Sequence, residues 1–276
     1  MRARPQAQPQ ARPQWMQVDV ALRRTAGQAR PHARAVLTTL GPHLEGWRAA
    51  QSLTWFHFTR KPPDLRLRFA GRDPGRDLGP PVQAVLARLA REGHVERHDL
   101  GLYEPETRKF GGPEAMALVH ALFDRDTAAW LALEELRATG HAVLTEAQAA
   151  TLLVQHLLRR VLPDDTERWD AWMNLADLLP APQAGPNLSM PPTRATRAER
   201  DVLAAAVEAA TAFSAGLTRL TQAGQLRVGP RAMLPHVAMA ILHRNGMTGP
   251  QQAALARAAA AGLDPHPART RLRKQR

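Results

Sequence analysis

The hydrophobic pattern of the chain changes its period at Gly111-Gly112-Pro113. Before this point, segments such as LRLRF at 65–69 alternate apolar and polar residues, as strands with one buried face do. After it, apolar residues recur at helical spacing from Ala115 onward, and Pro113 suits a first helical turn because its missing N–H has no partner there. Strands followed by helices predict an α+β fold, in which a small antiparallel sheet in the N-terminal half packs with a largely helical C-terminal half.

The individual elements follow from the same two periods and from turn residues. Strands or strand-like segments are expected at 15–22, 53–58, 65–69 and 94–106, with TRKPPD at 59–64 as a turn. Helices are expected at 31–50, with a break near Gly41-Pro42, and at 80–92, 114–139, 146–162, 164–179, 194–223, 230–244 and 249–262. Residues 180–193 predict an irregular loop.

The two ends of the chain hold most of its net charge of +12. Residues 1–34 contain seven Arg against one acid, and residues 264–276 contain five basic residues against one acid. Because residues 1–14 are polar and rich in proline, we expect a disordered tail there, then a single domain over 15–263 and a basic tail over 264–276. Charge of this kind without a nucleic-acid-binding motif does not predict a nucleic-acid partner.

Several classes of chemistry need residues that this sequence lacks. The chain has no cysteine, which excludes disulfides, thiolate catalysis and thiolate metal sites. It has no GxxxxGKS/T, GxGxxG, GxSxG or HExxH motif, and we expect neither a metal nor an organic cofactor. No apolar run reaches the roughly 18 residues of a spanning helix, and the N-terminus lacks the apolar stretch of a secretory signal. We therefore expect a cytoplasmic protein without a membrane partner.

Two arginines are the first candidate binding residues. Arg66 and Arg68 are two apart in a strand and therefore project from one face, while Leu65 and its alternate neighbours turn to the core. Paired guanidinium groups can hold a carboxylate or phosphate in bidentate fashion. The alternative is a solvated face paired with Asp64 or another acid, and spacing alone favours that alternative.

The segment YEPETRKFGG at 103–112 and one helical histidine are further candidates. Tyr103, the only tyrosine, Glu106 and Lys109 lie on a predicted loop, although a tight turn with a solvated rim explains the same residues. His236 and His243 are seven apart on one helical face, too distant to share a metal. His243 at the helix end is a candidate acid–base group, whose pKa the helix dipole would raise; a polar supporting role is the alternative.

Three blocks of sequence together resemble a known family: WFHFTRKPPDLRLRF at 55–69, YEPETRKFGGPEAMALVHALFDRDTAAWLAL at 103–133, and HRNGMTGPQQAALARAA at 243–259. They are similar to the glutamate-elimination (C-terminal) domain of class I lanthipeptide dehydratases, which also occurs as a free-standing protein in thiopeptide-type bacteriocin biosynthesis. The resemblance spans most of residues 15–262. It implies a lyase that removes glutamate from glutamylated Ser or Thr of a ribosomally made precursor peptide, leaving dehydroalanine or dehydrobutyrine. The implied partners are that peptide and a glutamylation-domain protein.

The resemblance also implies roles for individual residues. Arg66 and Arg68 match the paired arginines that bind the substrate glutamate, Glu106 matches a functional glutamate, and His243 matches the histidine of an H-x-N-R element. Tyr103 and Asn245 would support them. The sequence departs from the family where Lys109 replaces an arginine, where Phe110 replaces a tyrosine, and where Gly246 replaces the arginine of H-x-N-R.

Two other functions stay open at this point. Related free-standing proteins use the same scaffold for a pyridine-forming aza-cycloaddition, and a non-catalytic protein that binds the precursor peptide is the third interpretation. Retention of the paired arginines and of Glu106 favours elimination, because cycloaddition needs no site for glutamate. The identity of the precursor peptide stays open, and so does the oligomeric state, including a homodimer.

Overall fold

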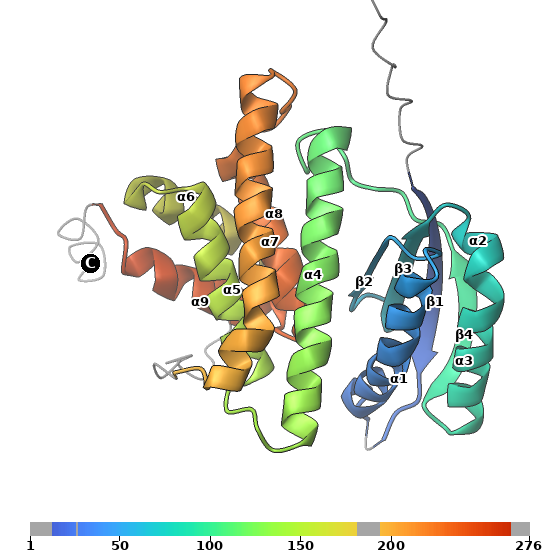
Figure 1. Cartoon of the computed structure of the whole chain (residues 1–276). Coiled ribbons are helices and arrows are strands. Elements are labelled where there is room, and N and C mark those ends of the chain that lie inside the picture. The colour runs from blue at the N-terminus through green and yellow to red at the C-terminus, as the bar shows by residue number, and fades with distance from the viewer. Residues whose placement is uncertain (1–12, 26, 181–193, 266–276) are drawn as a thin grey trace, which may run out of the picture. The chain divides into compact units, whose positions relative to one another are not determined.

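The computed structural model describes residues 13–25, 27–180 and 194–265. Its elements, in chain order, are β1 (Gln14–Leu22), α1 (Arg30–Ala49), β2 (Trp55–Thr59), β3 (Leu65–Gly71), α2 (Pro74–Asp77), α3 (Gly79–Arg91), β4 (Val95–Gly101), α4 (Pro113–Ala138), α5 (Glu146–Val161), α6 (Asp165–Asp177), α7 (Arg197–Gln222), α8 (Pro230–Arg244) and α9 (Gly249–Ala261) (Figure 1). The fold is therefore α+β, with the strands before α4 and helices after it, as the change of period predicts.

The described chain divides into two compact units. The sheet unit holds the residues up to Phe56 together with Pro62–Tyr103, and the helical unit holds His57–Lys61 together with the residues from Glu104 onward. The division falls inside β2, so the second half of this strand belongs to the helical unit. The predicted domain 15–263 covers most of both units, and its boundaries stay a prediction.

The strands form a four-stranded sheet in the order β2-β3-β1-β4, with β1 antiparallel to both β3 and β4, and the sheet unit holds all of it except the second half of β2. Alternate residues of β3, namely Leu65, Leu67 and Phe69, are fully buried, and Val18 of β1 lies opposite Leu67. Trp47 of α1 packs edge-on against Phe69, with ring centroids 6.1 Å apart, so α1 covers this apolar face. The period-two pattern therefore determines which side chains remain on the other face.

Helix α1 differs from the expectation, because it runs through Pro42 without a break. Proline removes one helical hydrogen bond and crowds the preceding turn. In this helix Leu37, Leu40 and Leu44 are buried at helical spacing, and the burial of each such side chain stabilises the fold by about 1.5–3 kcal/mol. Packing thus offsets the local cost, which the sequence pattern around Gly41-Pro42 does not reveal.

Smaller differences concern the ends of elements. Gln14 is the first residue of β1 and lies opposite Gly71, so the ordered strand begins inside the predicted tail. The short helix α2 was not expected. Residues 1–12, the predicted loop at 181–193 and residues 266–276 lie outside the described residues.

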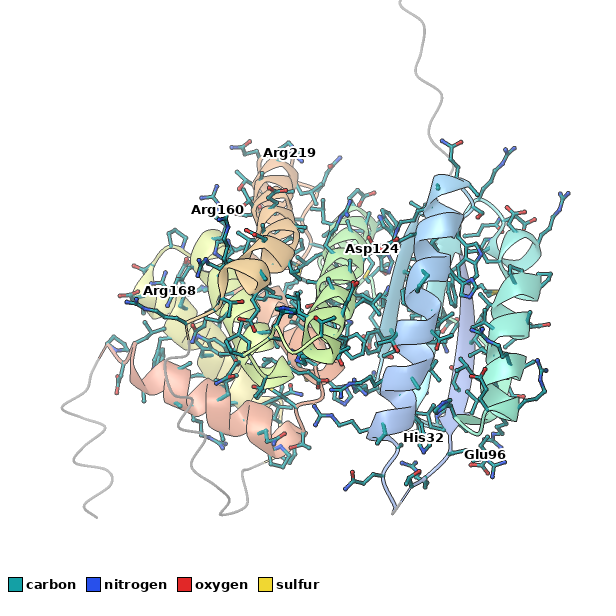
Figure 2. The ribbon with its side chains drawn as sticks, turned by 60° about the horizontal axis from the view of Figure 1, so that its bottom comes forward. His32, Glu96, Asp124, Arg160, Arg168 and Arg219 are labelled. Carbon is teal, nitrogen blue, oxygen red and sulfur yellow. The ribbon has the colours of Figure 1, made fainter. Side chains whose placement is uncertain are left out.

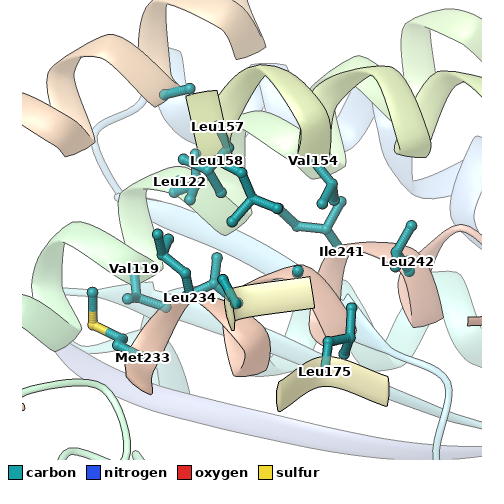
Figure 3. Packing of buried hydrophobic residues seen from close by; sticks show 14 of the residues in the cluster. Val119, Leu122, Val154, Leu157, Leu158, Leu175, Met233, Leu234, Ile241 and Leu242 are labelled. Carbon is teal, nitrogen blue, oxygen red and sulfur yellow. The ribbon is translucent and has the colours of Figure 1, made fainter. Parts of the chain in front are cut away.

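The largest apolar cluster of the helical unit is formed by helices α4 to α9 (Figure 3). Its labelled members are Val119, Leu122, Val154, Leu157, Leu158, Leu175, Met233, Leu234, Ile241 and Leu242. Three of its helices, α5, α7 and α9, begin with a capping box, formed by Thr145, Thr196 and Thr248. Arg168 of α6 donates to the carbonyl oxygens of Leu162 and Pro163, which follow α5 (Figure 2).

Helix α7 is the one described helix that is long and apolar enough to span a membrane by length and composition. Its buried residues recur every three or four positions, at Leu203, Ala206, Ala210, Phe213 and Leu217. This spacing places them on one face, which packs against α4 and α5. The pattern is that of a core helix with one polar face.

Glu199 in the first turn of α7 gives a prediction about stability. Its carboxylate accepts hydrogen bonds from the backbone N–H of Val143, Leu144 and Thr196, at 2.8, 2.6 and 2.8 Å. Burial alone would raise the pKa of Glu199, but these three N–H groups outweigh it and hold the pKa below its usual value. Glu199→Gln should lower the free energy of unfolding by about 1–3 kcal/mol at pH 7, because its amide nitrogen cannot accept a bond.

Urea denaturation at pH 7 and pH 3 would measure this effect. Because the folded pKa is lowered, the carboxylate stabilises the fold fully above the unfolded pKa of about 4.3 and loses this effect as the pH falls through the folded pKa. The difference between wild type and Glu199→Gln should therefore shrink at pH 3. Glu208→Gln, an exposed position on the same helix, is the matched control. An equal loss at both pH values would contradict the assignment.

Candidate functional site

Arg66 and Arg68 lie on the polar face of the sheet unit, as the alternation predicts. Arg66 is opposite Asp19 and Arg68 is opposite Gln17 in the neighbouring strand β1. Arg68 Nε donates to Gln17 Oε1 at 2.9 Å, whereas Arg66 Nε donates to the Pro62 carbonyl oxygen at 3.1 Å. Asp19 Oδ1 lies 3.9 Å from Arg66 Nε, which is a loose ion pair between half-exposed side chains.

Asp64, the acid considered as a partner for these arginines, has a different role. Its carboxylate pairs with Arg24 at 2.7 Å and accepts the backbone N–H of Leu22. It therefore joins the ends of β1 and β3. The acid that lies opposite Arg66 is Asp19.

Aromatic rings support Arg68 in the sheet unit. The Arg68 guanidinium carbon lies 4.1 Å from the centroid of the Tyr103 ring, a cation–π contact. Tyr103 packs edge-on against Trp15 at 5.0 Å, and Trp15 stacks on Trp55 at 6.3 Å. The ring and Gln17 together hold the guanidinium fork in one orientation, which is what bidentate binding of a carboxylate requires.

Glu106 and Lys109 lie in the helical unit, in the loop before α4. Their side chains form an ion pair with 2.7 Å between Lys109 Nζ and Glu106 Oε1. The loop ends in a tight turn, because Gly111 and Gly112 have φ values of +82° and +110°. A Cβ atom on Gly111 would approach Leu226 Cδ1 to 2.8 Å, so no other residue fits this turn without movement.

His236 of α8 is the candidate that reasoning from the sequence missed. Burial lowers the pKa of its half-buried ring, Lys109 lowers it further, and Glu106 raises it. The ring Nδ1 is buried and has no hydrogen-bond partner among the described residues. The available signal was the spacing of seven residues between His236 and His243, which places both on one face of the helix.

His243 lies at the other end of this face of α8, and its expected pKa direction was wrong. Burial lowers the pKa of His243, and Lys61, Arg60 and Arg244 lower it further, in that order. Burial and three cations outweigh the helix dipole, whose effect is confined to the last turn. The ring is therefore neutral at pH 7 and able to accept a proton.

The end of α8 explains two residues of the HRNG element. The N–H of Gly246 donates to the His243 carbonyl oxygen, and the N–H of Met247 donates to that of Leu242, the two bonds of a Schellman motif. Gly246 has φ of +79°, a value at which arginine would be strained. Asn245 is the C-cap, is buried, and donates from Nδ2 to the Ile241 carbonyl oxygen at 2.9 Å. Asn245 therefore lies at the C-terminal end of α8, two residues after His243.

Lysine is scarce in this chain, with three Lys against 34 Arg. The described residues include two of them, Lys61 and Lys109, and each faces one histidine of α8. The α8 face thus presents two histidines, each with a lysine near it. Among the described residues no group of three or more His, Asp or Glu side chains lies close enough to hold a metal ion.

The predicted site residues fall into two sets. Arg66, Arg68 and Tyr103 gather in the sheet unit, and the helical unit holds the others: Glu106, Lys109, His243 and Asn245.

Residues 15–262 match a family model described as "Lantibiotic biosynthesis dehydratase C-term". The fold is similar to the tRNA-dependent lantibiotic dehydratase MibB from Microbispora sp. 107891, with a TM-score of 0.66 and 19% identity over 98% of this chain and 29% of that one. It is also similar to TsrL, with a TM-score of 0.53 and 16% identity over 90% of this chain and 93% of that one. At these identities the likeness shows the fold; this chain spans less than a third of MibB. No curated protein matches the chain.

The two histidines of α8 give a pair of predictions, one for each nearby lysine. Lys61→Met should raise the pKa of His243, and Lys109→Met should raise the pKa of His236, because each removes a nearby positive charge. Glu106→Gln should lower the pKa of His236. The measurement is an NMR titration of the ring Cε1–Hε1 signals.

Each lysine variant is the control for the other. The two histidines are about 10 Å apart along the helix, where salt at 0.15 M screens most of the interaction between exposed charges. Lys61→Met should therefore leave the pKa of His236 close to its wild-type value. If either substitution shifted the pKa of both histidines, the effect would be global and would not arise from a local contact.

Proposed function

The chain belongs to the lantibiotic biosynthesis dehydratase C-terminal family, and on that basis we propose that it eliminates glutamate from glutamylated Ser or Thr of a ribosomally made precursor peptide. Membership of this family gives a role in the dehydration of lanthipeptides or thiopeptides. A glutamylation-domain protein is the proposed source of the glutamyl ester. The proposed products are dehydroalanine or dehydrobutyrine and free glutamate.

The observation that carries the proposal is the surroundings of His243. A neutral imidazole can take the Cα proton of the esterified residue. The electron pair of that C–H bond then forms the Cα=Cβ double bond, while the Cβ–O bond breaks and glutamate leaves as a carboxylate. Lys61 and Arg60, which add to the effect of burial in lowering the pKa of the imidazole, would also favour the negative charge that develops on the enolate and the leaving group.

The other site residues fit the charges of the substrate. A glutamyl ester carries a free carboxylate before the reaction, and Arg66 and Arg68 are suited to hold it because arginine stays charged at all working pH values. Lys109, held by Glu106, offers a positive charge beside His236. We propose that Glu106 and Lys109 take part in proton transfer or in stabilising the departing carboxylate.

Elimination is favoured here over the pyridine-forming cycloaddition. The anion-binding pair Arg66 and Arg68 is kept, and Tyr103 and Gln17 orient Arg68. Two dehydroalanines that react by cycloaddition bring no glutamate carboxylate to such a pair. A protein that only binds the peptide has no need of a neutral histidine among cations.

The test is incubation of the purified chain with glutamylated precursor peptide, followed by mass spectrometry. The expected result is loss of glutamate from each modified residue. An unchanged glutamylated peptide would refute the elimination. Cyclisation of a peptide that already contains dehydroalanines would support the alternative reaction.

His243→Ala gives the first activity prediction. The glutamylated peptide should accumulate, with a rate loss of about 100- to 10,000-fold, the usual contribution of a positioned base. Peptide binding should persist, as measured by fluorescence anisotropy with a labelled precursor. His141→Ala, at an exposed histidine outside both sets of site residues, is the matched control and should keep the wild-type rate.

The pH dependence follows from the same assignment. A base must be deprotonated, so the rate should rise with pH through the pKa of His243 and level off above it, below the ordinary value of about 6.5. Lys61→Met should move this rise to higher pH. A rate that falls as the pH passes through this region would assign His243 as the acid instead.

A further inference from the structure

Arg244 is adjacent to His243 in sequence, but its side chain points into the helical unit. It is 1% exposed, which is rare for arginine and calls for charged or polar partners. Its Nη1 binds the Asp126 carboxylate of α4, its Nε donates to the Phe58 carbonyl oxygen at 3.0 Å, and its guanidinium carbon lies 4.5 Å from the Phe123 ring centroid. One side chain thus joins the end of α8 to α4 and to the second half of β2.

The contact with β2 is reciprocal. Arg60 Nε donates to the Arg244 carbonyl oxygen at 2.9 Å, while Arg244 Nε donates to the carbonyl oxygen of Phe58, two residues earlier. The Arg60 guanidinium is further held near the rings of Phe58 and Trp130, at 5.6 and 5.9 Å. These bonds fix the segment that carries Arg60 and Lys61 against the helix end that carries His243.

The ion pair itself is a poor means of stabilising a fold. Burial raises the pKa of the Asp126 carboxyl, and the charge of Arg244 together with hydrogen bonds from Arg244 and Asn245 opposes this rise. Asp126 Oδ1 and Arg244 Nη2 remain without a hydrogen-bond partner among the described residues. Apolar residues in the place of such a pair often give equal or greater stability. A contribution to stability therefore does not explain why this ion pair is present.

We propose that Arg244, oriented by Asp126, is a positioning residue for the proposed elimination. It holds the His243 ring and the Arg60–Lys61 segment in fixed positions relative to each other. This inference rests on the proposed function for its effect on rate, although its effect on His243 can be measured without any reaction. The groups that face His243 are Lys61 and Arg60 from the end of β2 and Arg244 from its own helix. Asp126 of α4 acts on it through Arg244.

The first variant is Arg244→Lys, which keeps the positive charge. A lysine ammonium cannot reproduce the planar fork that binds Asp126 and Phe58 together. We expect kcat to fall about 10- to 100-fold with KM within about twofold, because a small misplacement of a catalytic group is costly while peptide contacts persist. We also expect the pKa of His243 to rise, since Arg60 and Lys61 are released from its neighbourhood while the charge at 244 remains.

A second variant covers the case in which Arg244→Lys does not fold. Asp126→Leu combined with Arg244→Met removes both charges and fills the space, and it should keep a cooperative thermal transition while kcat falls and the pKa of His243 rises. The matched control is Asp170→Leu with Arg231→Met, at the opposite end of α8, where the two side chains lie 4.0 Å apart near the surface. That control should keep both the wild-type kcat and the wild-type pKa of His243.

The outcomes separate this inference from the proposed function. A folded Arg244→Lys variant, or the folded double variant in its place, that keeps the wild-type kcat and the wild-type pKa of His243 would overturn the positioning role. A wild-type chain that releases no glutamate would instead refute the proposed function. In that case the NMR titration of His243 alone decides the positioning role, and a raised pKa in Arg244→Lys would still support it.

Discussion

The buried ion pair between Arg244 and Asp126 is the contact on which the arrangement of the helical unit's candidate site depends. It connects α8 with α4, and through Phe58 it connects both with the end of β2. A charge buried without its partner destabilises a protein strongly, so neither side chain can leave while the other remains. This constraint gives His243 one position among its neighbours.

The position of His243 determines its chemistry. An imidazole at a helix C-terminus in water would have a raised pKa, because the dipole favours its charged form. In this protein burial and three nearby cations reverse that direction. For the proposed elimination, the same positive charges that help to lower the pKa of the ring would also stabilise an anion formed beside it, so one set of residues would meet both requirements of proton removal, a neutral base and a stabilised product.

The sequence alone predicts those features that depend on local geometry. Arg66 and Arg68 share a face because strand side chains alternate, whatever the rest of the chain does. The direction of the His243 pKa could not be predicted in this way, since Arg60 and its hydrogen-bond acceptor at Arg244 are 184 residues apart in sequence. The continuity of α1 through Pro42 escaped prediction for the same kind of reason: a local rule was outweighed by packing. His236 was missed because only the folded chain places it beside Glu106 and Lys109.

The choice between arginine and lysine distinguishes the two sets of site residues. The sheet unit uses Arg66 and Arg68, whose charge does not change over the working pH range. The helical unit places lysines beside histidines, in a chain that otherwise uses arginine almost throughout. For the proposed elimination, a permanent charge suits the carboxylate that the glutamyl group carries before and after the reaction. A group that can change its protonation suits the atoms whose charge changes during the reaction, which is where His243 would act.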